Sequence, residues 1–441
     1  MPVLIRVRAL TLVFALSLYF AFVLNFALLR HFYEILSALD DFSIGFVISI
    51  PIVLVAALNF VFIPFVLVLI TGAMVSFAMV KYRIVFDRAM IQNIFETNSR
   101  EAGSYLNAHS IGMVVLMGVV PAILLLFVRV SYAERWYQGL YQRAGAMTGF
   151  LVIVAAFVGF LYQDYASIGR NNRELAKEVV PENYIASTIK YVKRRYLTSP
   201  VPFKIIGQDA VQVNRVSNIK PKLIFLVIGE TARAANYAVN GYDRPTNPFT
   251  QKIDKLVSFQ NVQSCGTATA ISVPCMFSPE NRESFDTDRA HNSEGLLDVV
   301  QKAGVSVFWK ENDDGCKGVC DRVPNMTLNP ADYPDLCQGR SCHDEAMLRN
   351  LDQQIADMKG KGDKLVGLHL IGSHGPTYFK RYPASFRTFT PDCPRSDIEN
   401  CSQEELVNTY DNTIRYTDYV ISQLVAKLAS YQDQYDTALI Y

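Results

Sequence analysis

The chain has 441 residues, 50% of them hydrophobic, and a formal net charge of +1. This length exceeds that of a single ordinary domain, and the near-neutral charge gives no support for a nucleic-acid partner. The apolar residues are unevenly spread, because residues 1–162 are mostly apolar whereas residues 163–441 have the composition of a soluble domain. We therefore expect a membrane domain followed by a soluble domain.

Five apolar stretches lie within residues 1–162, and each approaches the ~20 residues that a helix needs to cross a bilayer. The second and third stretches abut, so a single long buried hairpin is the alternative for that pair. We predict five transmembrane helices, at about 9–29, 44–61, 62–80, 110–130 and 145–162.

All eight cysteines follow the last apolar stretch. An even number of cysteines in close sequence pairs is typical of disulfides in an oxidising compartment. Eight cysteines allow 105 pairings, and a zinc cage is the alternative, although the spacings lack the paired C-x₂-C pattern of such sites. The simplest prediction is four local disulfides, Cys265–Cys275, Cys316–Cys320, Cys337–Cys342 and Cys393–Cys401.

Residues 163–220 are polar and charged, and the first part of this segment has a helical composition. Four basic residues close to its middle would suit anionic lipid headgroups. We interpret the segment as a bridging helix on the membrane surface and a linker, with an ordinary solvated helix as the alternative. The basic residues are Lys190, Lys193, Arg194 and Arg195.

From residue 221 onward, short apolar runs alternate with amphipathic segments. The runs at 222–228, 305–309, 365–372 and 437–441 are typical of buried parallel strands, and helices are predicted at 293–304 and 402–431. This alternation predicts an α/β domain with a parallel sheet over residues 221–441.

Ligands of such sheets bind at the carboxyl ends of the strands. Glu230 follows the first strand, within a stretch that reads as helix-like, and His374 follows the third. We interpret His369, inside that third strand, as a packed core histidine. We interpret Asp313 and Asp314, beside a glycine, as a turn rather than a weak cation site.

The stretch SCGTATAISVPCMFS, residues 264–278, permits two interpretations. It is a stapled surface loop, or it holds a hydroxyl rigid as a nucleophile. If Thr269 opens a short helix, the helix N-terminus favours negative charge on its oxygen. A threonine needs a base or a metal to become reactive, and a metal bound by Glu230 would serve. On spacing alone the stapled loop is favoured.

Several long motifs carry a resemblance: GETARAANYAVNGYDRPTNP, SCGTATAISVPCMFS, CKGVCDRVP and GSHGPTYFKRYP, together with QNIFETNSREAGSY and RNNREL near the membrane part. In this order they resemble the membrane phosphoethanolamine transferases that modify lipid A. That family includes polymyxin-resistance enzymes and belongs to the alkaline-phosphatase-like superfamily, which also contains the sulfatases. The resemblance covers nearly the whole chain.

The resemblance implies residue roles. Thr269 would be the nucleophile, and Glu230 and Thr269 would contact a zinc ion. Lys317 would contact the substrate phosphate, and His374 would lie near the transferred group, where a second metal is an option. The donor head group would lie on Asn93, Thr97 and Glu101, whose spacing of four residues places them on one helical face; the polar face of an interfacial helix is the alternative.

The family's Asp-His metal loop should follow residues 437–441, where this sequence ends, so we expect an incomplete catalytic domain and a 441-residue form that is inactive alone.

The implied activity is transfer of phosphoethanolamine from phosphatidylethanolamine to lipid A through a phospho-threonine. We expect a monomer in the bacterial inner membrane, with its catalytic domain in the periplasm and no nucleic-acid partner. Two alternatives stay open: a related glycerol-phosphate polymer synthase or sulfatase-like membrane enzyme, and a non-catalytic lipid-binding decoy.

Overall fold

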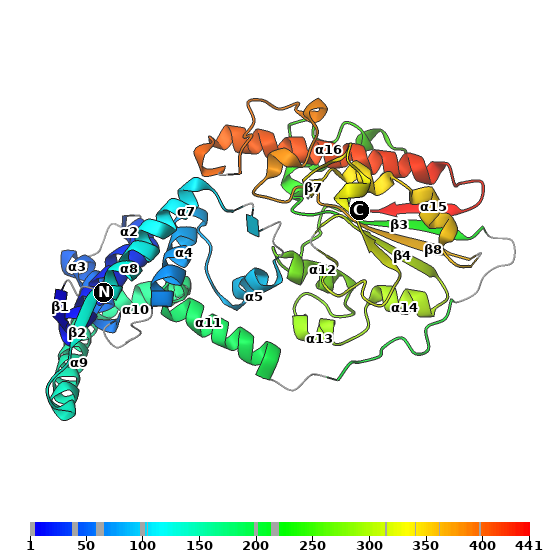
Figure 1. Cartoon of the computed structure of the whole chain (residues 1–441). Helices are drawn as coiled ribbons and strands as arrows, with labels where there is room; N and C mark the ends of the chain where they lie inside the picture. Colours follow the sequence, from blue (N-terminus) through cyan, green and yellow to red (C-terminus); the bar gives the residue numbers. More distant parts are fainter. Residues whose placement is uncertain are drawn as a thin grey trace. The chain divides into compact units, whose positions relative to one another are not determined.

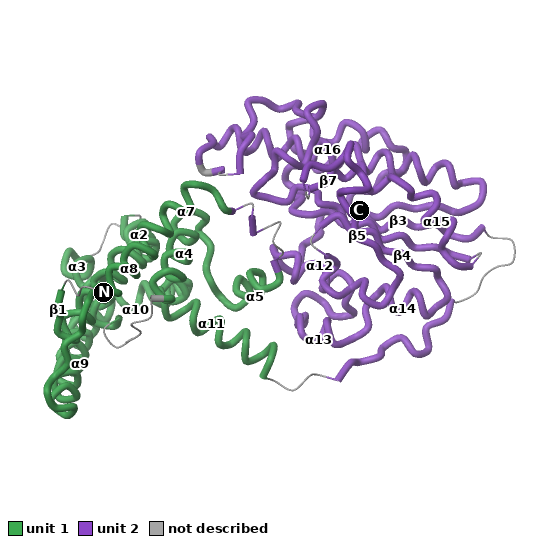
Figure 2. Tube along the Cα trace, viewed as in Figure 1, with its two compact units in different colours: residues 1–96, 106–198 green, residues 97–105, 199–441 purple. Residues whose placement is uncertain are grey.

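The computed structural model describes residues 5–37, 43–58, 66–97, 102–103, 105–197, 202–212, 220–313, 315–339, 341–360, 362–396 and 398–441. The chain divides into two compact units (Figure 2). Unit 1 comprises residues 1–96 and 106–198, and unit 2 comprises residues 97–105 and 199–441.

Unit 1 is helical, apart from a short parallel pair of strands, β1 (Ile5–Arg8) and β2 (Val128–Ser131) (Figure 1). Short π or 3-10 turns extend several of its helices at Phe20–Leu24, Val115–Val119, Arg173–Lys177 and Lys193–Leu197. Its α-helices are α1 (Ala9–Tyr19), α2 (Phe26–Ser37), α3 (Ile44–Leu58), α4 (Val66–Tyr82), α5 (Arg88–Glu96), α7 (Ala108–Val114), α8 (Val120–Leu126), α9 (Trp136–Phe160), α10 (Tyr162–Asn171) and α11 (Glu182–Val192).

The apolar helices differ in length more than the five predicted membrane crossings do. Within the described residues, Ala108–Leu126 and Trp136–Phe160 are long and apolar enough to cross a membrane. A third crossing requires α1 and α2 to act together, and these helices are bent by 57° at their junction. Helices α3 and α4 have 15 and 17 residues. They are about 22 and 25 Å long, short of the ~30 Å hydrocarbon core.

Of the predicted bridging helix and linker, 163–220, the part up to residue 198 belongs to unit 1 and the remainder to unit 2. Asn25, buried at the bend between α1 and α2, hydrogen-bonds both the N–H and the C=O of Val180 at 2.8 and 2.7 Å. The Tyr184 hydroxyl lies 2.8 Å from that of Thr71. Tyr184 and Tyr191 are buried, so α11 is packed against its unit and is not a plain solvated helix.

Unit 2 is an α/β domain. Its strands are β3 (Lys222–Ile228), β4 (Ser306–Glu311), β5 (Asn325–Thr327), β6 (Cys337–Gln338), β7 (Ser341–Cys342), β8 (Lys364–His369) and β9 (Asp436–Ile440). Its α-helices are α12 (Thr269–Phe277), α13 (Thr287–His291), α14 (Leu296–Lys302), α15 (Leu351–Asp357) and α16 (Gln403–Ala429). The four predicted strands and both predicted helices are confirmed within a few residues. The short strands β5, β6 and β7, with three, two and two residues, were not predicted.

The main sheet has the order β5-β4-β8-β3-β9, and all its neighbouring strands are parallel. Alternate residues of β3 point to opposite faces, as the two-residue repeat of a strand requires. Leu223, Phe225 and Val227 pack with α15 and α16, whereas Ile228 packs with α12 and α14. Helices therefore cover both faces (Figure 1), which explains the continuous apolar runs of these strands.

The stretch after Glu230 is not the helix that its composition suggests. It forms two short 3-10 turns, Ala234–Asn236 and Ala238–Asn240. Side chains of α16 bind this segment: Asp411 accepts a hydrogen bond from Asn236 at 2.8 Å, and Tyr410 accepts one from the N–H of Arg233 at 2.8 Å. These long-range contacts override the local helical preference.

Candidate active site

Glu230 lies just beyond the carboxyl end of β3, as predicted. The loop after β8 fixes its backbone, because the N–H of Ser373 donates to the Glu230 carbonyl at 3.0 Å. Gly372 has a φ of +46°, and a Cβ there would lie 2.8 Å from that carbonyl oxygen. Glycine at position 372 thus permits both the left-handed backbone and the close approach.

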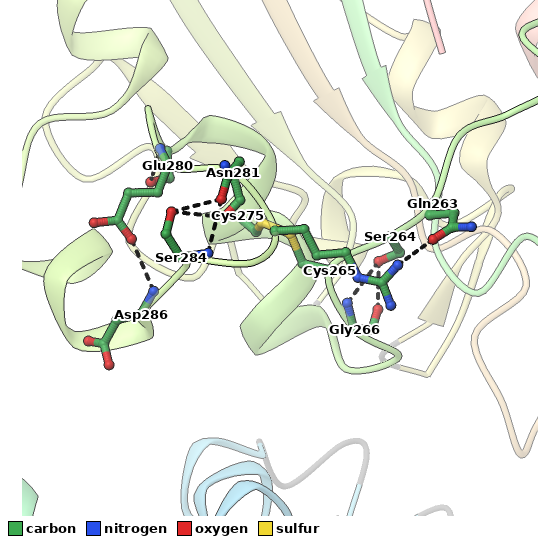
Figure 3. The surroundings of a disulfide bond; sticks show 11 residues. Gln263, Ser264, Cys265, Gly266, Cys275, Glu280, Asn281, Ser284 and Asp286 are labelled. Carbon is green, nitrogen blue, oxygen red and sulfur yellow. Dashed lines mark hydrogen bonds between the residues drawn. A yellow bond between two sulfur atoms is a disulfide. The ribbon is translucent and has the colours of Figure 1, made fainter.

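Thr269 is the first residue of α12. Its hydroxyl donates a 2.9 Å hydrogen bond to Oε2 of Glu230, so the two residues predicted to act together do meet. A disulfide between Cys265 and Cys275 joins the preceding loop to the body of α12 (Figure 3). The stapled-loop and nucleophile interpretations are therefore compatible, since the staple holds the loop that presents the hydroxyl.

The other three predicted disulfides are also present: Cys316–Cys320, Cys337–Cys342 and Cys393–Cys401. Every cysteine of the chain is therefore paired, and the alternative of a zinc cage made of these cysteines is wrong.

Two further side chains complete a cluster with Glu230. One potential ligand atom each from Glu230, Asp313 and His369 lies within 4.8 Å of the other two. Asp313 follows β4, and His369 ends β8, so all three lie at the carboxyl edge of the sheet. The interpretations of Asp313 as a simple turn and of His369 as an inert core histidine were incomplete: His369 is buried, but its ring faces carboxylates.

The ring of His369 is oriented by Glu311, whose Oε1 lies 2.9 Å from Nδ1. Burial lowers the pKa of His369, but the hydrogen bond to Glu311 and the negative charges of Glu311, Asp313 and Glu230 outweigh it and raise that pKa to about 9. Nε2 is buried, has no hydrogen-bond partner among the described residues, and lies 3.9 Å from Oδ2 of Asp313.

These residues fit a bound cation. Zinc accepts a mixed set of nitrogen and oxygen donors. The cluster offers such a set: one buried imidazole nitrogen without a hydrogen bond among the described residues, two carboxylates, and the hydroxyl that is hydrogen-bonded to one of them. The contact from Glu311 to the other ring nitrogen is the usual support of a ligating histidine. Such a cation would neutralise the closely spaced carboxylates.

His374, predicted to lie near the transferred group, is in the loop after β8, and Lys317, the predicted phosphate contact, is in the segment after β4. Nε2 of His374 lies 3.9 Å from Oδ1 of Asp313, so this histidine borders the cluster. Lys317 has a φ of +50° inside the Cys316–Cys320 loop. It lines a small pocket together with His291 and Arg322.

Asp344 is a buried residue of the site region that was not singled out from the sequence. Its two oxygens accept hydrogen bonds from the N–H groups of Ile371 and Gly372, both at 2.9 Å, and Asn312 donates a third at 2.8 Å. Burial raises the pKa of Asp344, and these donors oppose that shift. Asp344 thereby fixes the loop that supports Glu230; no local motif marks it.

The predicted head-group residues are only partly described. Asn93 lies on α5, but this helix ends at Glu96, so Thr97 follows it and does not continue its face. Glu101 lies outside the described residues.

Two protein families match the chain. The family described as Phosphoethanolamine transferase EptA/EptB matches residues 46–196, and the Sulfatase family matches residues 222–441. The first match lies in unit 1 and the second in unit 2.

Individual proteins and a solved structure agree with these matches. Phosphoethanolamine transferase EptA of Salmonella typhimurium is 40% identical over 375 residues, which are 85% of this chain and 68% of the relative. Phosphatidylethanolamine transferase Mcr-1 of Escherichia coli is 37% identical over 420 residues, 90% of this chain and 77% of the relative. The structure of the integral membrane protein lipooligosaccharide phosphoethanolamine transferase A of Neisseria meningitidis superposes with a TM-score of 0.92 at 35% identity, and covers 98% of this chain and 82% of its own.

Proposed function

Because the chain belongs to the phosphoethanolamine transferase family, and is thus a transferase, we propose that it moves phosphoethanolamine from phosphatidylethanolamine to lipid A. The observation that carries this proposal is the 2.9 Å hydrogen bond from Thr269 to Glu230, at the start of a helix and at the edge of the sheet. The name of Mcr-1 supports phosphatidylethanolamine as the donor, and the name of the Neisseria meningitidis protein supports a lipooligosaccharide as the acceptor.

Transfer would proceed in two steps. The oxygen of Thr269 forms a bond to the phosphorus of phosphatidylethanolamine as its proton leaves, and the bond from phosphorus to the diacylglycerol oxygen breaks. Diacylglycerol departs with that electron pair and takes up a proton. A phosphate oxygen of lipid A then attacks the phosphorus of the phospho-threonine and the bond from phosphorus to the Thr269 oxygen breaks. That oxygen leaves with the electron pair and takes up a proton, which restores the hydroxyl. A covalent intermediate of this kind predicts ping-pong kinetics.

The residues around Thr269 support the first step. Glu230, Asp313 and His369, together with the Thr269 hydroxyl, would hold a zinc ion. When bound, that ion would supply Lewis-acid chemistry that lowers the pKa of the hydroxyl. The N-terminus of α12 favours the negative phosphoryl group.

We assign the remaining contacts to other residues of the chain. Lys317 and His374 would contact the phosphoryl oxygens. Asn93, Thr97 and Glu101 would contact the ethanolamine of the donor.

The same proposal places the chain in the bacterial inner membrane as a monomer, with unit 2 in the periplasm. Four disulfides in unit 2 support an oxidising compartment. The apolar helices of unit 1 and the membrane location in the name of the Neisseria meningitidis relative support the membrane anchor. Five crossings would require the short helices α3 and α4 to span as well.

The test is a comparison of Thr269→Ala and Thr269→Ser in the full-length protein, expressed in a host whose lipid A is analysed by mass spectrometry. Loss of the hydroxyl should abolish the added phosphoethanolamine, while serine, which keeps an oxygen, should retain part of it. Modified lipid A from cells that carry Thr269→Ala would refute the proposal.

A further inference from the structure

Glu230 has a neighbour with an uncommon backbone conformation. Thr231 has a φ of +51°, and a β-branched residue in this left-handed region is an outlier. Such a conformation persists only where the surrounding structure enforces it. The hydroxyl of Thr231 donates a 2.6 Å hydrogen bond to Oε1 of Glu230, whereas the hydroxyl of Thr269 donates to Oε2. Each oxygen of the carboxylate thus has its own hydroxyl partner.

Tyr410 of α16 enforces this conformation. Its hydroxyl donates to the carbonyl oxygen of Thr231 at 2.7 Å and accepts from the N–H of Arg233 at 2.8 Å. One phenol oxygen therefore bridges the two peptide groups that flank Ala232. The ring of Tyr410 packs edge-on against that of Tyr378, with centroids 6.0 Å apart.

The adjacent residue of α16 anchors the same segment further along. Asp411 is buried, accepts hydrogen bonds from Asn236 and Tyr242, and forms a 2.6 Å ion pair with Arg244. This network fixes α16 against the segment after Glu230. Tyr410 therefore acts from a rigid helix, and its hydroxyl can define the position of Thr231.

We propose that Thr231 and Tyr410 are positioning residues that hold the Glu230 carboxylate in the orientation required for a metal ion shared with Thr269. The inference rests on the proposed function, because it concerns the same metal site. Neither residue contacts the reacting atoms: Tyr410 sets the backbone of Thr231, and the hydroxyl of Thr231 restricts rotation of the carboxylate. Loss of such outer contacts typically lowers metal affinity by about 10- to 100-fold.

The test measures zinc affinity of the full-length, detergent-solubilised protein by competition with a chromophoric chelator. Tyr410→Phe and Thr231→Val should each weaken zinc binding by about 10- to 100-fold, while Thr231→Ser should retain the wild-type affinity. Glu230→Gln is the reference variant, because it gives the loss of zinc affinity expected when a metal ligand itself is removed. Tyr416→Phe is the matched control, because Tyr416 lies on the same helix and its hydroxyl donates to Glu345 at 2.9 Å.

Thermal unfolding without zinc separates positioning from stability. Tyr410→Phe and Tyr416→Phe should lower the melting temperature similarly, but only Tyr410→Phe should weaken zinc binding. If Thr231→Val does not fold, Thr231→Gly replaces it, since glycine accepts the positive φ and lacks the hydroxyl.

The outcomes distinguish the two proposals. If Glu230→Gln loses zinc while Tyr410→Phe and the Thr231 variant bind like wild type, the positioning proposal is overturned and the proposed function stands. If Glu230→Gln also binds zinc like wild type, the metal site is misassigned and the positioning proposal fails with it, while the proposed transfer is still decided by Thr269→Ala.

Discussion

Chemistry at the site depends on single side chains whose positions are set by distant parts of the chain. Thr269 and Glu230 are separated by 39 residues, yet they share a 2.9 Å hydrogen bond. The backbone of Glu230 is held by a hydrogen bond from Ser373, and Gly372 permits the close approach of the two segments. The reactivity proposed for Thr269 is therefore a property of the folded domain, since an isolated threonine hydroxyl is a poor nucleophile.

Lys317 allows a direct test of the proposed phosphate contact. Lys317→Gln should lower phosphoethanolamine transfer by about 100-fold, because removal of one group that stabilises developing negative charge has an effect of that order. Lys317→Arg keeps the charge but changes its geometry, so partial activity is expected. The exposed Lys252 provides the control, since Lys252→Gln should leave the rate unchanged. A wild-type rate for Lys317→Gln would remove this residue from the mechanism. The rates are measured as phosphoethanolamine added to lipid A.

The residues of the site differ in how well the sequence alone predicts their role. Glu230 and Thr269 lie in long motifs and were predicted. His369 was predicted to be a packed core residue and Asp313 to be part of a turn. Their place in the cluster depends on strand register, because β4 pairs with β8 so that Glu311 is opposite His369. Periodicity predicts that these strands are buried, but not which strands are neighbours. Asp344 was missed for the same reason, since its partners are backbone groups 27 and 28 residues away.

Among the elements, α12 depends on a covalent staple. The Cys265–Cys275 disulfide (Figure 3) has a sequence separation of 10. Thr269 lies within the loop that it closes. Replacement of both cysteines by serine should cost about 2 to 4 kcal/mol of stability and should also lower transfer sharply, because the loop before α12 loses its tether.

The control is the double serine replacement of Cys393 and Cys401, which closes a loop of similar length elsewhere in unit 2. It should cost comparable stability, measured by thermal unfolding, with a much smaller loss of transfer. Equal losses of transfer in both double variants would show that the Cys265–Cys275 staple has no particular role at the site.

The linker into the catalytic domain is attached by a carboxylate that lies two residues before the first residue of α14. Glu294 is buried, forms an ion pair with Lys302, and accepts hydrogen bonds from the N–H groups of Ile206 and Gly207 at 3.1 and 3.2 Å. The hydrogen bond from Lys302, helped by those two N–H groups and opposed by burial, lowers the pKa of Glu294.

A lowered folded-state pKa gives this carboxylate a stabilising effect that is complete above its unfolded-state pKa of about 4.3. The effect is lost as the pH falls from there through the folded-state value. Glu294→Gln should therefore lower the melting temperature at pH 7, and the difference from wild type should shrink in acid. The same difference at pH 7 and well below pH 4 would contradict the assignment.

For the whole molecule, local patterns predicted much of the fold. The four main strands and all four disulfides follow from short apolar runs and close cysteine pairs. The membrane part was predicted less well, because hydropathy marks apolar residues but not helix breaks. The buried Asn25 ends one helix and binds Val180, a contact between residues 155 positions apart. That contact also ties the helical part of the bridge, up to residue 198, to unit 1, which composition alone did not indicate.

The most direct test of the account concerns the covalent step. Full-length protein shown to modify lipid A is incubated with phosphatidylethanolamine vesicles that lack an acceptor, and the peptide containing Thr269 is analysed by mass spectrometry. The account predicts a phosphoethanolamine group on Thr269 that disappears when lipid A is added, and that does not form after zinc is removed by a chelator. An active preparation with an unmodified Thr269, or with the group on another residue, would contradict it.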